Sequence, residues 1–172
     1  NEVIHLLTAV RERVGPELKM DKNKYAMNEQ MLARIQRMIM KQKICLAQAK
    51  VIWEKRAPQG AFGRTEQLRI QAVARDQGSL EEDCKVCWEI MNLAHNVGFG
   101  LFPLEARILL ELARTDAQAA TKRLQAYDPG PETQGIQSAI LGRLQAIAKL
   151  LGPGFAETAP EMDRRFTYDS FV

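Results

Sequence analysis

Apolar residues recur at helical spacing along most of the chain. From Asn28 onward an apolar residue returns every three or four positions, as at Met31, Ile35 and Met38, and the same spacing resumes after Lys41–Lys43. This period places the apolar residues on one face of an α-helix. The alternation of Val, Ile and Thr that is typical of strands is absent, so we predict an all-α fold.

Glycine, proline and short polar segments predict where these helices end. They divide the chain into short helices that are joined in antiparallel pairs, or hairpins. Ser79 and Glu82 have the spacing of a capping box, which predicts a helix start just after a turn at Gln77-Gly78-Ser79. The predicted helices cover residues 2–14, 28–41, 44–56, 65–76, 80–96, 104–114, 116–127 and 132–151, the last with a break near Gly142.

A repeat of thirty-five residues runs through the first two predicted hairpins. Laying Arg34–Glu54 over Arg69–Glu89 gives eight identities in twenty-one positions, and the two tryptophans of the chain fall at equivalent places. We therefore predict a short solenoid of stacked hairpins. In this arrangement Trp53 and Trp88 would each fill the seam against the next hairpin.

The solenoid is predicted to carry a different segment at each end. Residues 1–27 contain the amphipathic helix Glu2–Val14, which ends at Gly15-Pro16 and would cap the hairpins of residues 28–151. Residues 152–172 are irregular and would form an extended C-terminal arm that docks on a partner protein, or would fold back over the last hairpin. The aromatic residues expected to make this contact are Phe155, Phe166, Tyr168 and Phe171.

Residues 74–82 read Ala-Arg-Asp-Gln-Gly-Ser-Leu-Glu-Glu across the predicted turn of the second hairpin. Together with the thirty-five-residue period, this segment resembles a pentatricopeptide repeat, and the resemblance covers residues 28–127. The turn glycine, the leucine and the acidic residues of the family are matched by Gly78, Leu80, Glu81 and Glu82. The resemblance implies a right-handed solenoid that binds RNA or belongs to an RNA–protein assembly such as an organellar ribosome. It also implies a mitochondrial or other organellar location; without it, the cytoplasm is expected.

The distribution of charge predicts where such an RNA would bind. The chain has a net charge of +3, but residues 1–60 carry twelve Lys and Arg against six Asp and Glu. Because Ala33 and Leu68 occupy the positions that read bases in the family, and both are apolar, we expect contact with the RNA backbone. Three basic side chains share one helix face and a fourth lies close by, although a solvated helix face would show the same pattern. The candidate phosphate contacts are Arg34, Arg37, Lys41 and Lys43.

No group of residues predicts catalysis or a cofactor. Cys84 and Cys87 have the only spacing typical of a metal site, but a tetrahedral zinc ion needs four ligands, and Cys45 would be the third thiolate at most. Buried thiols that act as small apolar residues are the favoured alternative. His5 and His95 are not accompanied by a nucleophile signature.

We therefore expect a non-enzymatic helical scaffold without a cofactor. In the main hypothesis it is a small subunit of an organellar ribonucleoprotein that contacts RNA and neighbouring proteins. The alternative is a tetratricopeptide-like adaptor that binds protein alone. Three cysteines, an odd number, favour a reducing compartment over a disulfide framework. No apolar run approaches the roughly 20 residues that a membrane span requires, so we expect no membrane contact.

Overall fold

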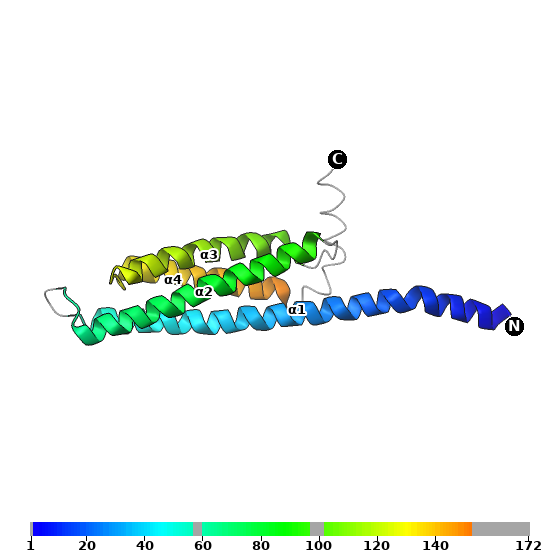
Figure 1. Ribbon diagram of the computed structural model, residues 1–172, viewed down its shortest axis with the longest axis horizontal. Coiled ribbons are helices and arrows are strands. Elements are labelled where there is room, and N and C mark those ends of the chain that lie inside the picture. Colours follow the sequence, from blue (N-terminus) through cyan, green and yellow to red (C-terminus); the bar gives the residue numbers. More distant parts are fainter. Residues whose placement is uncertain (1, 57–59, 97–101, 153–172) are drawn as a thin grey trace, which may run out of the picture.

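Four α-helices make up the regular structure of the described chain (Figure 1). The structure is a computed structural model that describes residues 2–56, 60–96 and 102–152, with side chains from residue 24 onward. All of its described secondary elements are helical, which confirms the all-α prediction. The helices are α1 (Glu2–Glu54), α2 (Arg64–Asn96), α3 (Leu104–Gln125) and α4 (Pro131–Leu151).

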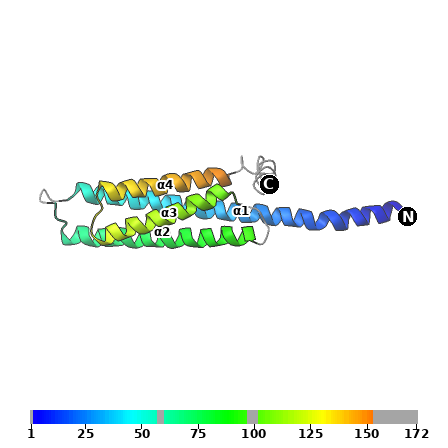
Figure 2. The same ribbon diagram turned by 90° about the horizontal axis from the view of Figure 1, so that it is seen from above.

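The four helices pack in a closed ring, α1 against α2, α2 against α3, α3 against α4, and α4 back against α1 (Figures 1 and 2). Neighbouring helices run antiparallel. In a solenoid each unit contacts only the units next to it in sequence. Contact between the first and last helices makes this an up-down-up-down four-helix bundle, which differs from the predicted stack of hairpins.

The helix ends predicted at five internal positions are wrong, because the helices run through them without interruption. In contrast, α2 begins directly after Gly63, α3 after Pro103 and α4 at Pro131, where turns were predicted. The five internal positions are Gly15-Pro16, Lys41–Lys43, Gln77-Gly78-Ser79, Thr115 and Gly142.

The polar residues that suggested turns have partners compatible with a continuous helix. Gln42 and Gln77 are buried and hydrogen-bonded to each other across the bundle. Ser79 accepts a hydrogen bond from a lysine of α1 and does not cap a helix. The hydroxyl of Thr115 donates to the backbone oxygen four residues earlier, which a helix accommodates. Gly142 is exposed, and a lone glycine costs a helix only about 1 kcal/mol.

The first half of α1 projects beyond the other helices (Figures 1 and 2). At the end of the bundle, the side-chain Nδ2 of Asn28 donates to the backbone oxygen of Leu151 (3.1 Å). Residues 2–27 continue the same helix past this point. Proline removes one helical hydrogen bond and favours a kink, but Pro16 does not end α1. The separate capping helix predicted for this region is therefore part of α1.

A layer of buried polar side chains crosses the middle of the bundle. Gln77 Nε2 donates to Gln42 Oε1 (2.9 Å), Gln137 Nε2 donates to Gln77 Oε1 (3.0 Å), and Gln42 Nε2 donates to the backbone oxygen of Gln137 (3.0 Å). All three glutamines are 0% exposed. Thr121 of α3 completes the layer and donates to the backbone oxygen of Ala117 (2.8 Å). We call this set of hydrogen bonds the glutamine ring.

The glutamine ring separates two apolar clusters. The larger cluster fills the end of the bundle near Leu151 and contains eighteen buried residues. The smaller cluster lies at the end near Trp53 and contains six. The six residues of this small core are Cys45, Ile52, Ile70, Val73, Ala74 and Leu124.

The glutamine ring also explains the thirty-five-residue repeat. The offset makes Gln42 equivalent to Gln77, and these residues face each other. Because α1 and α2 are antiparallel, the other equivalent pairs lie toward opposite ends of the bundle. Their separation increases with their distance in sequence from the two glutamines. The repeat therefore relates α1 to α2 by an approximate two-fold axis through the ring. Trp53 and Trp88 therefore lie at opposite ends of the α1–α2 hairpin.

Candidate functional site

The four basic residues that were predicted to contact RNA differ in their surroundings in the structure. Arg34 and Arg37 are exposed and form no ion pair with a described residue. Lys41 Nζ lies 2.6 Å from Asp83 Oδ2 and 3.0 Å from Ser79 Oγ, so its charge is already paired. Lys43 is exposed two residues further on, which places it on another side of the helix. Contact with RNA stays a prediction, with two of the four residues on a common free surface.

The other predicted candidates fall in different parts of the chain. His95 is exposed in the last turn of α2, and the side chain of His5 is not described. The predicted partner contacts lie outside the described residues. These are Phe155, Phe166, Tyr168 and Phe171.

The three cysteines are buried thiols. Burial raises the pKa of the Cys84 thiol to about 12, and the neighbouring Cys87 adds to this effect. Burial likewise raises the pKa of Cys87 and of Cys45 to about 11. Within the described part of the chain, no group of three or more His, Cys, Asp or Glu residues could hold a metal ion.

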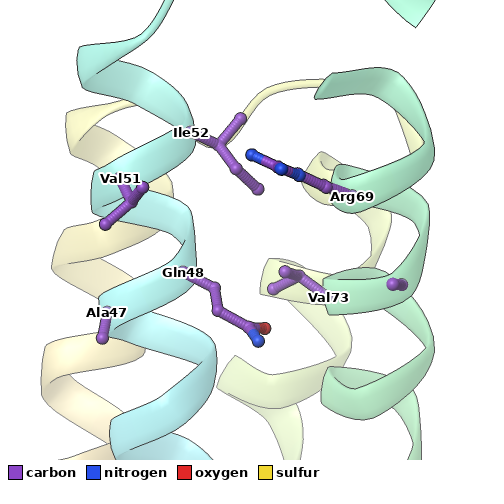
Figure 3. A pocket seen from close by; sticks show the side chains of 7 residues that line it. Ala47, Gln48, Val51, Ile52, Arg69 and Val73 are labelled. Atoms are coloured by element: carbon purple, nitrogen blue, oxygen red, sulfur yellow. The ribbon is translucent and has the colours of Figure 1, made fainter. Parts of the chain in front are cut away.

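A groove lies between α1 and α2, over the small core (Figure 3). It has a volume of about 380 Å³. In Figure 3, Gln48 and Ile52 of α1 point toward Arg69 and Val73 of α2. We call this site the α1–α2 groove. Its lining residues are Ala47, Gln48, Val51, Ile52, Arg69, Ala72 and Val73.

Apolar side chains beside the groove are exposed to an unusual degree. Met40, Ile44 and Val51 follow one another at helical spacing along the outer side of α1, and they are 57%, 52% and 45% exposed. Leu68, across the groove on α2, is 58% exposed. These residues add no packing to the core of the bundle, so they extend the apolar surface of the groove outward.

Positive charge surrounds this apolar surface. Residues 41–76 carry eight Lys and Arg against three Asp and Glu. Lys43 and Lys50 are exposed one turn on either side of Ala47, and Arg69 lines the groove itself. The Lys41–Asp83 ion pair joins α1 and α2 next to Gln42 of the glutamine ring. The α1–α2 groove is therefore apolar at its base and basic at its edges.

A second exposed apolar row lies on α3. Leu104, Ile108 and Leu112 are 54%, 51% and 45% exposed and form a shallower hollow of about 290 Å³ with Trp88. Arg107 in this hollow donates to Asn92 Oδ1 (3.2 Å). This row resembles the α1–α2 groove in exposure but has no comparable excess of positive charge.

The α1–α2 groove was not predicted, although the sequence carries a pattern that indicates it. Met40, Ile44 and Val51 lie one or two residues away from the stripe that builds the core, so they form a second apolar face on α1. A helix that belongs to one bundle needs only one such face. The second face would have indicated a binding surface.

Comparison with known proteins adds no relative: no family model matches the chain, and no curated protein or solved structure matches it either. None of the helices that the structure describes combines the length and the apolar character needed to cross a membrane.

Proposed function

We propose that this protein is a non-enzymatic helical scaffold that binds an acidic amphipathic helix of a partner protein in the α1–α2 groove. The observation that carries the proposal is the coincidence of an exposed apolar groove with a basic edge. Grooves of this kind accept the apolar face of a helix, which inserts side chains spaced three or four residues apart.

The apolar part of the groove supplies the affinity. Ile44, Val51 and Leu68 are each about half exposed, and covering the remaining surface of such side chains is worth about 1 kcal/mol each. A contiguous apolar surface of this kind on a monomer is typical of an interaction site.

The basic part of the groove selects the partner. Lys43, Lys50 and Arg69 would face the flanks of a helix that lies in the groove, so acidic residues on those flanks would be attracted and basic ones repelled. These exposed pairs add little affinity individually, but they raise the association rate and fix the orientation of the bound helix.

An RNA ligand fits the groove less well. Single-stranded RNA gains specificity by stacking bases on aromatic or arginine side chains, and the groove lining contains a single arginine, Arg69, and no aromatic residue. Arg34 and Arg37 lie on the other side of the Lys41–Asp83 pair and remain a second candidate surface. Their exposure favours contact with phosphates, as in the organellar ribonucleoprotein that the pentatricopeptide resemblance implies.

The test uses a synthetic peptide of about 16 residues, which forms about four helical turns. It carries leucine on one face and glutamate on the others, and a peptide of the same composition with a scrambled order is the control. Titration calorimetry compares the wild-type chain with the groove variant Ile44→Asp/Val51→Asp. The matched control variant is Ile108→Asp/Leu112→Asp, since its residues are 51% and 45% exposed against 52% and 45% in the groove.

The groove variant should bind the leucine–glutamate peptide about tenfold or more weakly, and the α3 variant should bind it like the wild type. Equal losses in both variants, or no preference over the scrambled peptide, would show that the groove is not the site. A single-stranded oligouridine is titrated in parallel with an Arg34→Ala/Arg37→Ala variant. RNA binding that this variant abolishes, without peptide binding by the wild type, would favour the RNA scaffold instead.

A further inference from the structure

The C-terminal arm leaves the bundle beside the exposed apolar row of α3. Helix α4 ends at Leu151, at the end of the bundle where α2 ends and α3 begins (Figure 2). Leu151 and Phe102, which lies two residues before α3, belong to the same buried cluster. Residues 153–172 lie outside the described structure and continue the chain from this end. The arm therefore starts close to Leu104, the first residue of the row.

The row borders a hollow between α2 and α3 that combines an apolar surface with one unpaired cation. Arg107 in this hollow forms no ion pair with a described residue. Glu111, the carboxylate of the lining, instead accepts two hydrogen bonds from Arg114, of 2.9 and 2.6 Å. We call this site the α2–α3 hollow. Its apolar lining residues are Trp88, Leu104, Ile108 and Leu112.

One segment of the arm has the chemistry that this hollow lacks. Residues 166–171 read Phe-Thr-Tyr-Asp-Ser-Phe, so three of the six are aromatic and Asp169 is the only charged one. Aromatic side chains bury a large apolar area when they cover such a surface, and a carboxylate is the natural partner of an arginine. Residues 152–172 together carry four Asp and Glu against two Arg, so the arm as a whole is attracted to a cation.

We propose that residues 166–171 dock in the α2–α3 hollow of the same chain, with their aromatic side chains over the apolar row and Asp169 paired with Arg107. The arm is long enough. The fourteen residues from Gly152 to Phe166 span up to about 46–50 Å when extended. Neighbouring helices lie about 8–10 Å apart, and the row from Leu104 to Leu112 is about 12 Å long.

Tethering makes a weak contact sufficient. Flexible linkers hold the two sites at an effective concentration of roughly 1 mM. A contact with a dissociation constant of ~0.1 mM between separate molecules would then be about 90% formed within one chain. The contact of three aromatic side chains with a half-exposed apolar row therefore does not have to be strong to keep the arm docked.

The position of the hollow favours it over the α1–α2 groove as the place where the arm binds. Asn28 of α1 marks the end of the bundle where α4 ends, because it donates to the backbone oxygen of Leu151. Gln48 in the α1–α2 groove lies twenty residues further along α1, which is about 30 Å. The α2–α3 hollow begins at the exit of the arm, so docking there closes a shorter loop and costs less entropy.

The experiment locates the arm by the effect of a nitroxide on backbone amide signals of the full chain. The three native cysteines are buried, so a thiol-specific nitroxide reacts with the new side chain in Ser170→Cys, and wild type treated in the same way is the control. The amide signals of Ile108 and Leu112 should lose most of their intensity, and those of Ile44 and Val51 should keep it. The intensity should return when ascorbate reduces the nitroxide.

Matched variants of the labelled chain test the two sides of the contact. Phe166→Ala/Tyr168→Ala/Phe171→Ala should restore the intensity at positions 108 and 112, and Ile108→Asp/Leu112→Asp should do the same from the other side. Asp169→Asn should restore part of it. Phe155→Ala changes an aromatic residue outside the docked segment and should have no effect.

The nitroxide is also placed at Thr167→Cys, so that a label that itself prevents docking is recognised. Unchanged intensity at Ile108 and Leu112 with both labels would overturn the proposal, as would a loss that persists in the triple aromatic variant. A loss at Ile44 and Val51 instead would place the arm in the α1–α2 groove and would overturn it too. Labelled chain is finally mixed with isotope-enriched chain that carries no nitroxide. An equal loss in this mixture would show docking on a second copy, against the proposal.

Discussion

Replacing Gln42 alone should destabilise the bundle more than replacing the whole glutamine ring. In Gln42→Leu, two hydrogen bonds of 2.9 and 3.0 Å are lost, and the amide of Gln77 is left buried without that partner. Each lost bond contributes about 1 kcal/mol and a buried unpaired group costs a further ~1–3 kcal/mol. The backbone oxygen of Gln137 keeps its helical hydrogen bond. We therefore expect a decrease in the free energy of unfolding of about 3–5 kcal/mol.

The triple variant Gln42→Leu/Gln77→Leu/Gln137→Leu removes donors and acceptors together. No polar side chain of the ring is then stranded, and the three leucines join the two apolar clusters. Replacing a buried polar network by apolar residues of similar size is often neutral or stabilising. The triple variant should therefore be more stable than Gln42→Leu, in spite of carrying two additional substitutions.

Urea denaturation followed by far-UV circular dichroism gives both free energies. The control Gln36→Leu lies on an exposed position of the same helix and should change the stability by less than about 0.5 kcal/mol. A triple variant less stable than Gln42→Leu would show that the side chains act independently, and the reasoning about a connected ring would be refuted. An unchanged stability in Gln42→Leu would refute it as well.

Three further predictions concern burial. The pKa values of Cys84 and Cys87 are raised to about 12 and 11 in the folded chain, so these thiols lose their protons at lower pH in the unfolded chain than in the folded one. The free energy of unfolding should therefore fall as the pH rises from about 9 toward 11, which urea midpoints would measure. Ile147→Ala, at a fully buried position, should cost about 2–5 kcal/mol, whereas Leu112→Ala, 45% exposed, should cost much less in the same assay. In Gly130→Ala the new Cβ would lie 2.8 Å from Asp128 Oδ1 and 3.2 Å from the Trp53 ring. The free energy of unfolding should therefore fall by about 1–3 kcal/mol, seen as a lower thermal midpoint; an unchanged midpoint would show that both side chains move aside freely.

The helical class could be predicted from the sequence because it depends on local period alone. Core positions such as Met31, Ile35 and Met38 are indeed buried. The lengths of the helices could not be predicted in the same way. Gln42 and Gln77 look like turn residues until their partners from other helices are known, and those partners are up to 95 residues away in sequence.

The candidate site illustrates the same limit. The excess of basic residues in the first third of the chain is visible in the sequence, and it does border the groove. Which lysines are free depends on tertiary contacts: Lys41 is paired with Asp83, forty-two residues later, whereas Lys43 is exposed. The thirty-five-residue repeat does relate α1 to α2, but by a two-fold rotation and not by the translation of a solenoid. Sequence identity alone does not distinguish these two relations between repeats.

The unequal division of the core means that the two ends of the bundle should open at different rates. Among the described residues, the apolar cluster beside the α1–α2 groove has six buried members, against eighteen in the cluster beyond the glutamine ring. Amide hydrogens near Ile70 should therefore exchange with solvent sooner than those near Leu144, in units that open cooperatively. A helix bound in the groove would slow the first group and leave the second unchanged. The glutamine ring would then be the boundary at which local opening stops, and exchange rates would report occupancy of the groove.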